Sequence, residues 1–159
     1  MDADALSALI DRHAGALTLY ARQWTDAPED VVQTAFLKLV RLGRPPENPV
    51  PWLYTVVRNA ARDAERSARR RSKYESRRAE HAPNWFDPDS EAGIDGETAT
   101  AALESLPADV REIMLAHLWG GLTFEQIADT VGGSASTAYR RYVAGITALR
   151  SKLGVSCPT

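Results

Sequence analysis

Two consecutive glycines, Gly132 and Gly133, interrupt a stretch of helical periodicity in the last third of the chain. Before them, apolar residues recur at helical spacing: Phe124, Ile127, Ala128 and Val131. After them a second apolar stripe follows, made of Ala138, Tyr142, Ile146, Leu149 and Leu153. Glycine adopts positive φ without a Cβ penalty and therefore commonly ends a helix. The segment from Thr123 to Leu153 thus predicts two helices joined by a tight turn.

Polar residues at the two helix starts support this interpretation. Thr123 and Gln126 have the spacing of a capping box, and Ser134 and Thr137 are suited to capping the second helix. The second helix has no acidic residue, and its start offers four polar or basic side chains: Ser136, Tyr139, Arg140 and Arg141. A recognition helix reads bases with its first residues, while guanidinium groups neutralise phosphates. The pattern predicts a DNA-binding helix-turn-helix, and an ordinary amphipathic hairpin is the alternative.

Charge is segregated into blocks along the chain of 159 residues, although the formal net charge is only −2. From Arg58 to Arg78 there are nine basic residues against three acidic ones. From Asp87 to Glu97 there are five acidic residues and no basic one. A basic block attracts phosphate whatever charge the rest of the chain carries. The near-neutral total therefore does not exclude a nucleic-acid partner.

Two amphipathic helices are predicted before the basic block. The first has an apolar stripe of Leu6, Leu9, Ile10, His13, Leu17, Tyr20, Ala21 and Trp24. The second runs from Glu29 to about Leu42, with Val32, Ala35, Phe36, Leu39 and Val40 as its core stripe. Its other face combines Asp30, Gln33, Thr34, Lys38 and Arg41 with Val31 and Leu37. Such a face suits a protein partner, although a leucine at the edge of a broad core is the simpler explanation.

A third helix is expected to begin near Trp52, after a proline-rich loop from Gly43 to Pro51. Arg58, Arg62, Arg66 and Arg70 stand four residues apart on its outer face. At a rise of ~1.5 Å per residue, this row repeats every ~6 Å, close to the spacing of phosphates along one strand. Arg69, Arg71, Lys73, Arg77 and Arg78 extend it, and of these only Arg71 has an acidic residue four positions on, Glu75. Trp52 and Tyr54 lie beside the row, where aromatic rings can stack on single-stranded bases, and Trp52 is equally well explained as a core residue.

The segment from Ser72 to Thr98 has no sustained apolar period, and its later part mixes Pro, Gly and acidic residues as interdomain linkers do. Trp85 and Phe86 are the apolar exception within it. Helical periodicity returns at Ala99, in a short helix to about Leu106, followed by a helix with Val110, Ile113, Met114 and Leu118 inward. No segment alternates long enough to predict a strand. The sequence predicts an all-α protein of two small helical domains joined by a flexible linker.

Signatures of catalysis, metal binding and membrane insertion are missing from the sequence. It has no phosphate-binding loop, no GxSxG or HExxH motif and no paired CxxC, and its histidines are scattered. Cys157 is the single cysteine and has no companion ligands. No run approaches the ~20 apolar residues that span a bilayer, and the acidic N-terminus is unlike a signal peptide. We therefore expect a cytoplasmic binding protein that is not an enzyme and has no cofactor, metal or membrane partner.

Three segments, in this order, resemble the extracytoplasmic-function group of bacterial sigma factors, in the sigma-70 family. DAPEDVVQTAFLKLVR (26–41) is similar to the family's region 2.2, and PWLYTVVRNAARDAERSARRR (51–71) to its regions 2.3 and 2.4. The stretch from Leu103 to Arg150 is similar to region 4. The resemblance implies a region 2 domain at 1–71, a linker at 72–98 and a region 4 domain at 99–159. It covers nearly the whole chain.

The resemblance also implies a role for each surface. Region 2.2 would bind the clamp coiled coil of the largest subunit of core RNA polymerase, through Asp30, Gln33, Thr34 and Leu37. Regions 2.3 and 2.4 would open the −10 element and hold its non-template strand, through the loop 48–51 with Asn48, and through Trp52, Tyr54, Arg58, Asn59, Arg62 and Arg66. Taking a base out of the stack costs a few kcal/mol, which a pocket and phosphate neutralisation can offset. Region 4 would dock on the polymerase and read the −35 duplex through Ser134, Ser136, Thr137, Tyr139, Arg140 and Arg141. An anti-sigma factor is a possible further partner.

The recognition helix departs from the pattern of many family members. They have a Gly-Val-Ser turn followed by Thr-Val-Lys-Ser-Arg, whereas this chain has Gly133 before Ser134, and Tyr139 and Arg140 before Arg141. The competing hypothesis is a free-standing helix-turn-helix regulator that binds duplex operators as a dimer. The arginine row argues against it, because a dimerisation or sensing domain has no use for such a row. An RNA-binding helical protein is a third, weaker alternative, for which no module signature is present.

Overall fold

The computed structural model describes residues 1–73 and 96–154, and of Gly96 and Glu97 only the backbone. The chain divides into two compact units, Met1–His81 and Ala82–Thr159. Within the described residues every regular element is a helix and no strand occurs, which confirms the predicted all-α class. The predicted linker 72–98, with Trp85 and Phe86, lies mostly outside the described residues, as do Arg77, Arg78 and Cys157. The domain boundaries stay a prediction.

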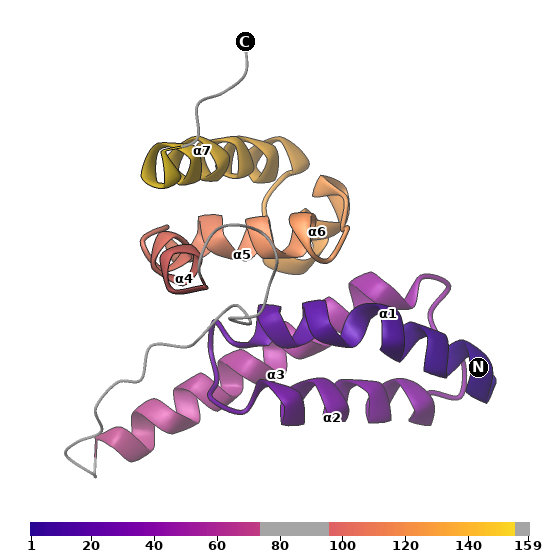
Figure 1. Ribbon diagram of the computed structural model, residues 1–159. Coiled ribbons are helices and arrows are strands. Elements are labelled where there is room, and N and C mark those ends of the chain that lie inside the picture. The colour runs from indigo at the N-terminus through magenta and orange to yellow at the C-terminus, as the bar shows by residue number, and fades with distance from the viewer. Residues whose placement is uncertain (74–95, 155–159) are drawn as a thin grey trace. The chain divides into compact units, whose positions relative to one another are not determined.

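The first unit consists of three helices, α1 (Ala3–Ala21), α2 (Pro28–Arg41) and α3 (Pro49–Ser72), each packed against the other two (Figure 1). Asp2 caps α1, since its Oδ1 accepts a hydrogen bond from the Ala5 amide at 2.7 Å. Helix α2 has a proline at its start, acidic residues in its first turn and basic residues in its last, the arrangement that the helix dipole favours.

The core of the first unit is formed by the buried apolar sides of all three helices. The buried residues are Leu17, Leu19, Tyr20, Ala21, Val32, Ala35, Phe36, Leu39, Leu53, Tyr54, Val57 and Ala61. Tyr20 links the helices, with its ring 5.1 Å from that of Trp24 and 4.9 Å from that of Tyr54. Burying each large side chain contributes roughly 1.5–3 kcal/mol. This core fixes the outward faces of α2 and α3.

Three predictions about these helices were wrong in detail. Helix α3 begins at Pro49, so Pro49 and Pro51 lie in its first turn, where no intrahelical amide donor is required. Val40, predicted to lie in the core, is 55% exposed although Leu39 beside it is buried, because Val40 lies on the same side of α2 as exposed Leu37. Tyr54, which was predicted to contact DNA, belongs to the core.

The second unit consists of α4 (Gly96–Glu104), α5 (Ala108–Leu118), α6 (Phe124–Val131) and α7 (Ala135–Leu153), with α7 packed against the other three (Figure 1). The predicted short helix therefore begins three residues earlier, at Gly96. The core of the second unit contains Leu103, Leu106, Ile113, Met114, Leu115, Leu122, Ile127 and Ala138. Leu118, predicted to face inward, is 46% exposed because α5 ends there and the chain turns away.

Gly145 allows α7 to approach α5 closely. A Cβ built at Gly145 would lie 2.7 Å from Cγ1 of Val110 and closer still to the Sδ atom of Met114. Atoms of a real side chain do not approach so closely, so the position accepts no side chain without movement of α5 or Met114. This contact sets the distance between the two helices one turn after Arg141.

Candidate nucleic-acid interfaces and partner surface

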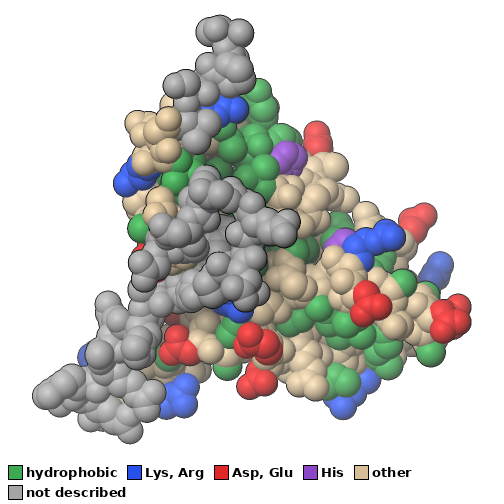
Figure 2. Space-filling model, in the orientation of Figure 1, with side chains coloured by type: hydrophobic (Ala, Val, Ile, Leu, Met, Phe, Trp, Pro, Cys, Tyr) green, Lys and Arg blue, Asp and Glu red, His purple; other side chains and the backbone are tan. Residues whose placement is uncertain are grey.

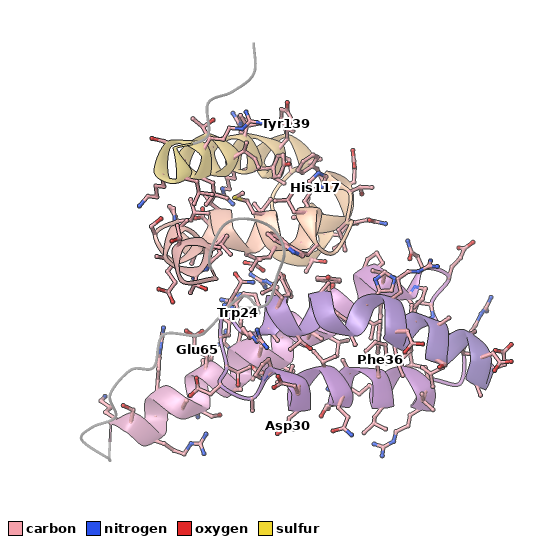
Figure 3. All side chains as sticks on the ribbon, viewed as in Figure 1. Trp24, Asp30, Phe36, Glu65, His117 and Tyr139 are labelled. Carbon is pink, nitrogen blue, oxygen red and sulfur yellow. The ribbon has the colours of Figure 1, made fainter. Side chains whose placement is uncertain are left out.

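Helix α2 presents one continuous exposed face. Asp30, Gln33, Thr34 and Leu37 were predicted to bind a protein partner, and all four are exposed. Their spacing of three and four residues places them on one side of the helix. The Thr34 hydroxyl is satisfied within the helix, because it donates to the Asp30 carbonyl at 2.8 Å. Figure 3 shows Asp30 on the side of α2 opposite to Phe36, which points toward α1.

Large hydrophobic side chains extend this face toward the end of α2. Leu37 is 47% exposed, Val40 55% and Leu42 37%. Figure 2 shows hydrophobic side chains reaching the surface of this unit between charged ones. Sequence reasoning missed Val40 and Leu42, because both continue the helical period and neither differs in type from a core residue. An apolar patch with a charged rim is typical of a protein-binding surface.

The arginine row follows α3 as predicted, although its members differ in exposure. Arg66 and Arg70 are exposed, whereas Arg58 and Arg62 lie partly against the helix bundle. Asn59 is exposed on the neighbouring turn. Residues four apart lie on neighbouring turns of one helix, so the four arginines follow an oblique path along α3. The row is therefore compatible with a nucleic-acid backbone.

Some of these arginines pair with acidic residues that precede them on α3, which the prediction did not consider. Arg66 Nη1 lies 3.3 Å from Asp63 Oδ1, and Arg69 Nη2 lies 3.0 Å from Glu65 Oε1. The prediction considered acids only on the C-terminal side of each arginine, whereas both partners precede it. Exposed pairs of this kind contribute only about 0.2–1 kcal/mol, so a phosphate can displace the carboxylate.

The start of α3 separates three residues that were predicted to contact the −10 strand. Asn48 is exposed at the N-cap, and its side chain makes no capping hydrogen bond. Trp52 is partly exposed. Tyr54 is completely buried, and its hydroxyl has no hydrogen-bond partner among the residues that the structure describes. Burial raises the pKa of Tyr54 above its ordinary value, so the phenol stays neutral. Tyr54 therefore presents no surface to a strand, since its ring packs on that of Tyr20.

The turn between α6 and α7 has the geometry that its sequence predicts. Thr123 and Gln126 form a capping box, with hydrogen bonds of 2.9 Å and 3.1 Å in the two directions. Gly132 and Gly133 have φ values of 92° and 87°. Ser134 caps α7, since its Oγ accepts from the Thr137 amide at 3.2 Å. Local hydrogen bonds and two left-handed glycines therefore fix where α7 starts.

The first turns of α7 expose the residues predicted to read a duplex. Ser134, Ser136, Tyr139, Arg140 and Arg141 are exposed, and Thr137 is partly exposed. The Thr137 hydroxyl accepts from Arg140 Nη2 at 3.3 Å. A hollow of about 460 Å³ lies beside them, lined by Phe124, Glu125, Ala135, Ser136, Tyr139 and Arg140. The structure thus brings all six predicted residues to one end of one helix.

An aromatic cluster supports this end of α7. Phe124 packs edge-on against Tyr139 at 5.4 Å and stacks on His117 at 4.4 Å, and His117 also meets Tyr142 at 4.7 Å. His117 Nδ1 lies 2.9 Å from the Leu122 carbonyl oxygen. Figure 3 shows His117 and Tyr139 at the same end of this unit. The sequence assigned His117 no role, and its packing role depends on contacts with two other helices, α6 and α7.

Asp109 is a further residue that sequence reasoning missed. Its Oδ2 lies 3.3 Å from Nε of Arg141, which belongs to another helix. The one available signal was an acidic residue in the first turn of α5, a common feature of helices. Among the described residues, no group of three or more His, Cys, Asp or Glu side chains is arranged to hold a metal ion. No helix in the described ranges is long and apolar enough to cross a membrane.

The two units match two family models in sequence order. The model for sigma-70 region 2 matches residues 9–71, and that for sigma-70 region 4 matches residues 97–149. RNA polymerase sigma factor CarQ of Myxococcus xanthus is 35% identical over 158 residues, covering 95% of this chain and 90% of that protein. ECF RNA polymerase sigma factor SigL of Mycobacterium tuberculosis is 33% identical over 166 residues, covering 98% and 94%.

Solved structures show the same fold. The sigma factor RpoE of Bartonella quintana, in complex with the anti-sigma factor NepR, superimposes with a TM-score of 0.76 at 22% identity, covering 95% of this chain and 98% of that one. CnrH, in complex with the cytosolic domain of CnrY, gives a TM-score of 0.63 at 20% identity, covering 98% and 92%. At these identities the likeness concerns the fold alone.

Proposed function

This chain belongs to the extracytoplasmic-function group of the sigma-70 family, and we propose from this premise how its surfaces divide the work of a promoter-specificity subunit. Such a subunit binds core RNA polymerase and directs initiation by recognising −10 and −35 elements. The observation that supports the division is that each unit carries its own exposed basic helix face, on α3 and on α7. A regulator that only bound duplex operators would need one such face.

The exposed face of α2 binds core polymerase, at the clamp coiled coil of the largest subunit. It combines exposed Leu37, Val40 and Leu42 with Asp30, Gln33 and Thr34. Apolar side chains surrounded by polar ones are what a helix needs to pack on another protein's helices. The solved sigma factor RpoE is bound to the anti-sigma factor NepR, and we propose that a similar protein can compete for faces of this chain.

Helix α3 handles the opened −10 strand. Asn48 and Trp52 lie at its start, where an unstacked base can be received, and Asn59 and the arginines 58, 62 and 66 follow along its outer side. Aromatic stacking and phosphate neutralisation together bind a single strand without a duplex partner. Because Asn48 makes no capping hydrogen bond, its amide is available to a base edge.

The start of α7 reads the −35 duplex in the major groove. Ser136, Tyr139 and Arg140 line the hollow beside α6 and are placed to meet base edges, while Arg141 contacts a phosphate. Linking the two readers in one chain makes the second contact effectively intramolecular. We place this activity in the cytoplasm, where the polymerase and the chromosome are.

The decisive experiment is in vitro transcription with purified core polymerase, this chain and genomic fragments of the source organism. We expect specific start sites that require the chain, with −35 and −10 elements at a constant separation. A chain that gives no start sites, but footprints duplex DNA tightly on its own as a dimer, would instead be a free-standing regulator. Core polymerase without the chain is the control for initiation at fragment ends.

A further inference from the structure

Arg141 is held by a carboxylate from another helix before any DNA is present. Its Nε lies 3.3 Å from Asp109 Oδ2, and the two side chains are 43% and 54% exposed. No other residue in the described parts of the chain forms a hydrogen bond or ion pair with this guanidinium group. Its terminal nitrogens therefore remain for an outside acceptor, and a phosphate accepts from such a fork in a bidentate manner.

Asp109 is itself anchored at the start of α5. Its Oδ1 is 3.0 Å from the amide nitrogen of Val110, and the first turn of a helix favours a negative charge. Val110, the next residue, meets Gly145, which lies one turn after Arg141 on α7. The tight contact at Gly145 thus fixes the distance over which the carboxylate and the guanidinium group meet.

We infer that Asp109 is a positioning residue for promoter recognition: it holds Arg141 by Nε and turns the terminal nitrogens toward a phosphate of the −35 duplex. The inference rests on the proposed function of α7. An arginine side chain loses much rotamer freedom when it binds, and a partner that already orders the side chain reduces this loss. Asp109 also repels the phosphates, and because salt screens this repulsion only beyond about 8 Å, it opposes the positioning effect at the phosphate that Arg141 binds.

A double-mutant cycle in holoenzyme separates these two effects. Core polymerase is assembled with the unchanged chain, Asp109→Asn, Arg141→Gln or both, and binding to a promoter fragment selected in the transcription assay is titrated at several salt concentrations. We expect Asp109→Asn to weaken binding by about two- to fivefold when Arg141 is present, which corresponds to the free energy of an exposed ion pair. In the Arg141→Gln background, Asp109→Asn causes no weakening. Arg141→Gln alone lowers the salt slope by about 0.9, one phosphate contact. Asp109→Glu, which keeps the charge, restores part of the affinity.

Other outcomes overturn the inference. An equal gain of affinity in both backgrounds means that Asp109 only repels DNA, and a larger gain when Arg141 is present means that it competes with the phosphate. Equal weakening in both, with a lower melting temperature, means a structural role only. If the unchanged chain gives no specific start sites, the proposed function itself fails, and this inference fails with it. Normal start sites with additive effects overturn the inference alone.

Discussion

The two basic surfaces of this molecule are constructed differently. At the start of α7, a Ser134 cap fixes the helix, Phe124 supports Tyr139, and Asp109 holds Arg141. On α3, Asn48 makes no capping bond at the helix start, and further along, within the described residues, Arg66 and Arg69 pair with carboxylates of their own helix. A duplex has a regular shape that rewards preformed geometry, whereas a single strand adapts to the surface that binds it. The difference between the surfaces therefore agrees with the proposed division between duplex and opened strand.

The largest effect is expected from reversing charge on the strand-handling surface. Arg62→Glu together with Arg66→Glu should reduce open-complex formation on the order of 100-fold at physiological salt, because two phosphate contacts become repulsions. Permanganate reactivity of unpaired thymines measures opening, and binding to core polymerase should be unchanged. Arg12→Glu, an exposed position on α1, is the matched control.

The opposite pattern is expected from α2. Leu37→Asp should reduce affinity for core polymerase, with loss of opening only as a consequence, because an acidic group replaces an apolar contact. Ile10→Asp changes another exposed apolar residue and serves as control. Equal loss of core binding in the α2 and α3 variants would contradict the division of surfaces.

The same substitution at two glycines should have opposite effects on stability. Gly145→Ala should destabilise the second unit by about 1–3 kcal/mol, since the methyl group would collide with Met114 and Val110. Gly15→Ala, in α1, meets nothing within 4 Å and should stabilise the first unit by roughly 0.5–1 kcal/mol. Denaturant unfolding followed separately in the two units measures both. If Gly145→Ala leaves the second unit unchanged, the close helix contact is not as described.

A smaller effect tests how the two helix starts are held. Ser134→Ala should cost about 1 kcal/mol, because it removes the hydrogen bond to the Thr137 amide. Asn48→Ala, at the equivalent position of α3, removes no capping bond and should change stability by less than about 0.5 kcal/mol. The free energy of unfolding from urea titration distinguishes them. Equal losses of unfolding free energy in the two variants would show that the starts of α3 and α7 do not differ in side-chain capping.

The smallest effect concerns the local pairs on α3. Glu65→Gln should change the free energy of unfolding by no more than about 0.5 kcal/mol. The reason is that Glu65 and its partner Arg69 are four residues apart on one helix and lie at the surface. At the same time it should slightly strengthen binding to single-stranded DNA, since Arg69 loses a competing carboxylate. Fluorescence anisotropy with a labelled oligonucleotide and the holoenzyme measures this. Weaker binding would indicate that Glu65 orients Arg69 rather than competing.

The features predicted well from the sequence are those that neighbouring residues determine. The capping box at Thr123, the left-handed glycines and the Ser134 cap all depend on a few consecutive positions, and each is present. Periodicity also gave the buried side of α2, through Ala35 and Phe36. Local signals therefore sufficed for the helix-turn-helix and for the all-α class.

The misplaced residues share a different cause, because their environment depends on distant segments. Periodicity gives the direction of Val40 and Leu118 but not whether another helix covers them, and both are exposed. Tyr54 stands beside the basic row in sequence, yet Tyr20 from α1 occupies the space next to its ring. The pairing of Asp109 with Arg141 joins helices far apart in the chain, so no local pattern could indicate it.

The contact between His117 and Leu122 also gives the second unit a built-in spectroscopic reporter. A carbonyl oxygen can only accept, so Nδ1 of His117 must carry the proton and, in the neutral ring, Nε2 has the lone pair. This is the less common tautomer of free histidine, and nitrogen chemical shifts in NMR spectra distinguish the two forms. Because Phe124 and Tyr142 flank the same ring, the signal would change whenever the packing beneath α7 changes. Docking of this unit on DNA or polymerase is therefore measurable with nitrogen-15 enrichment and without a dye.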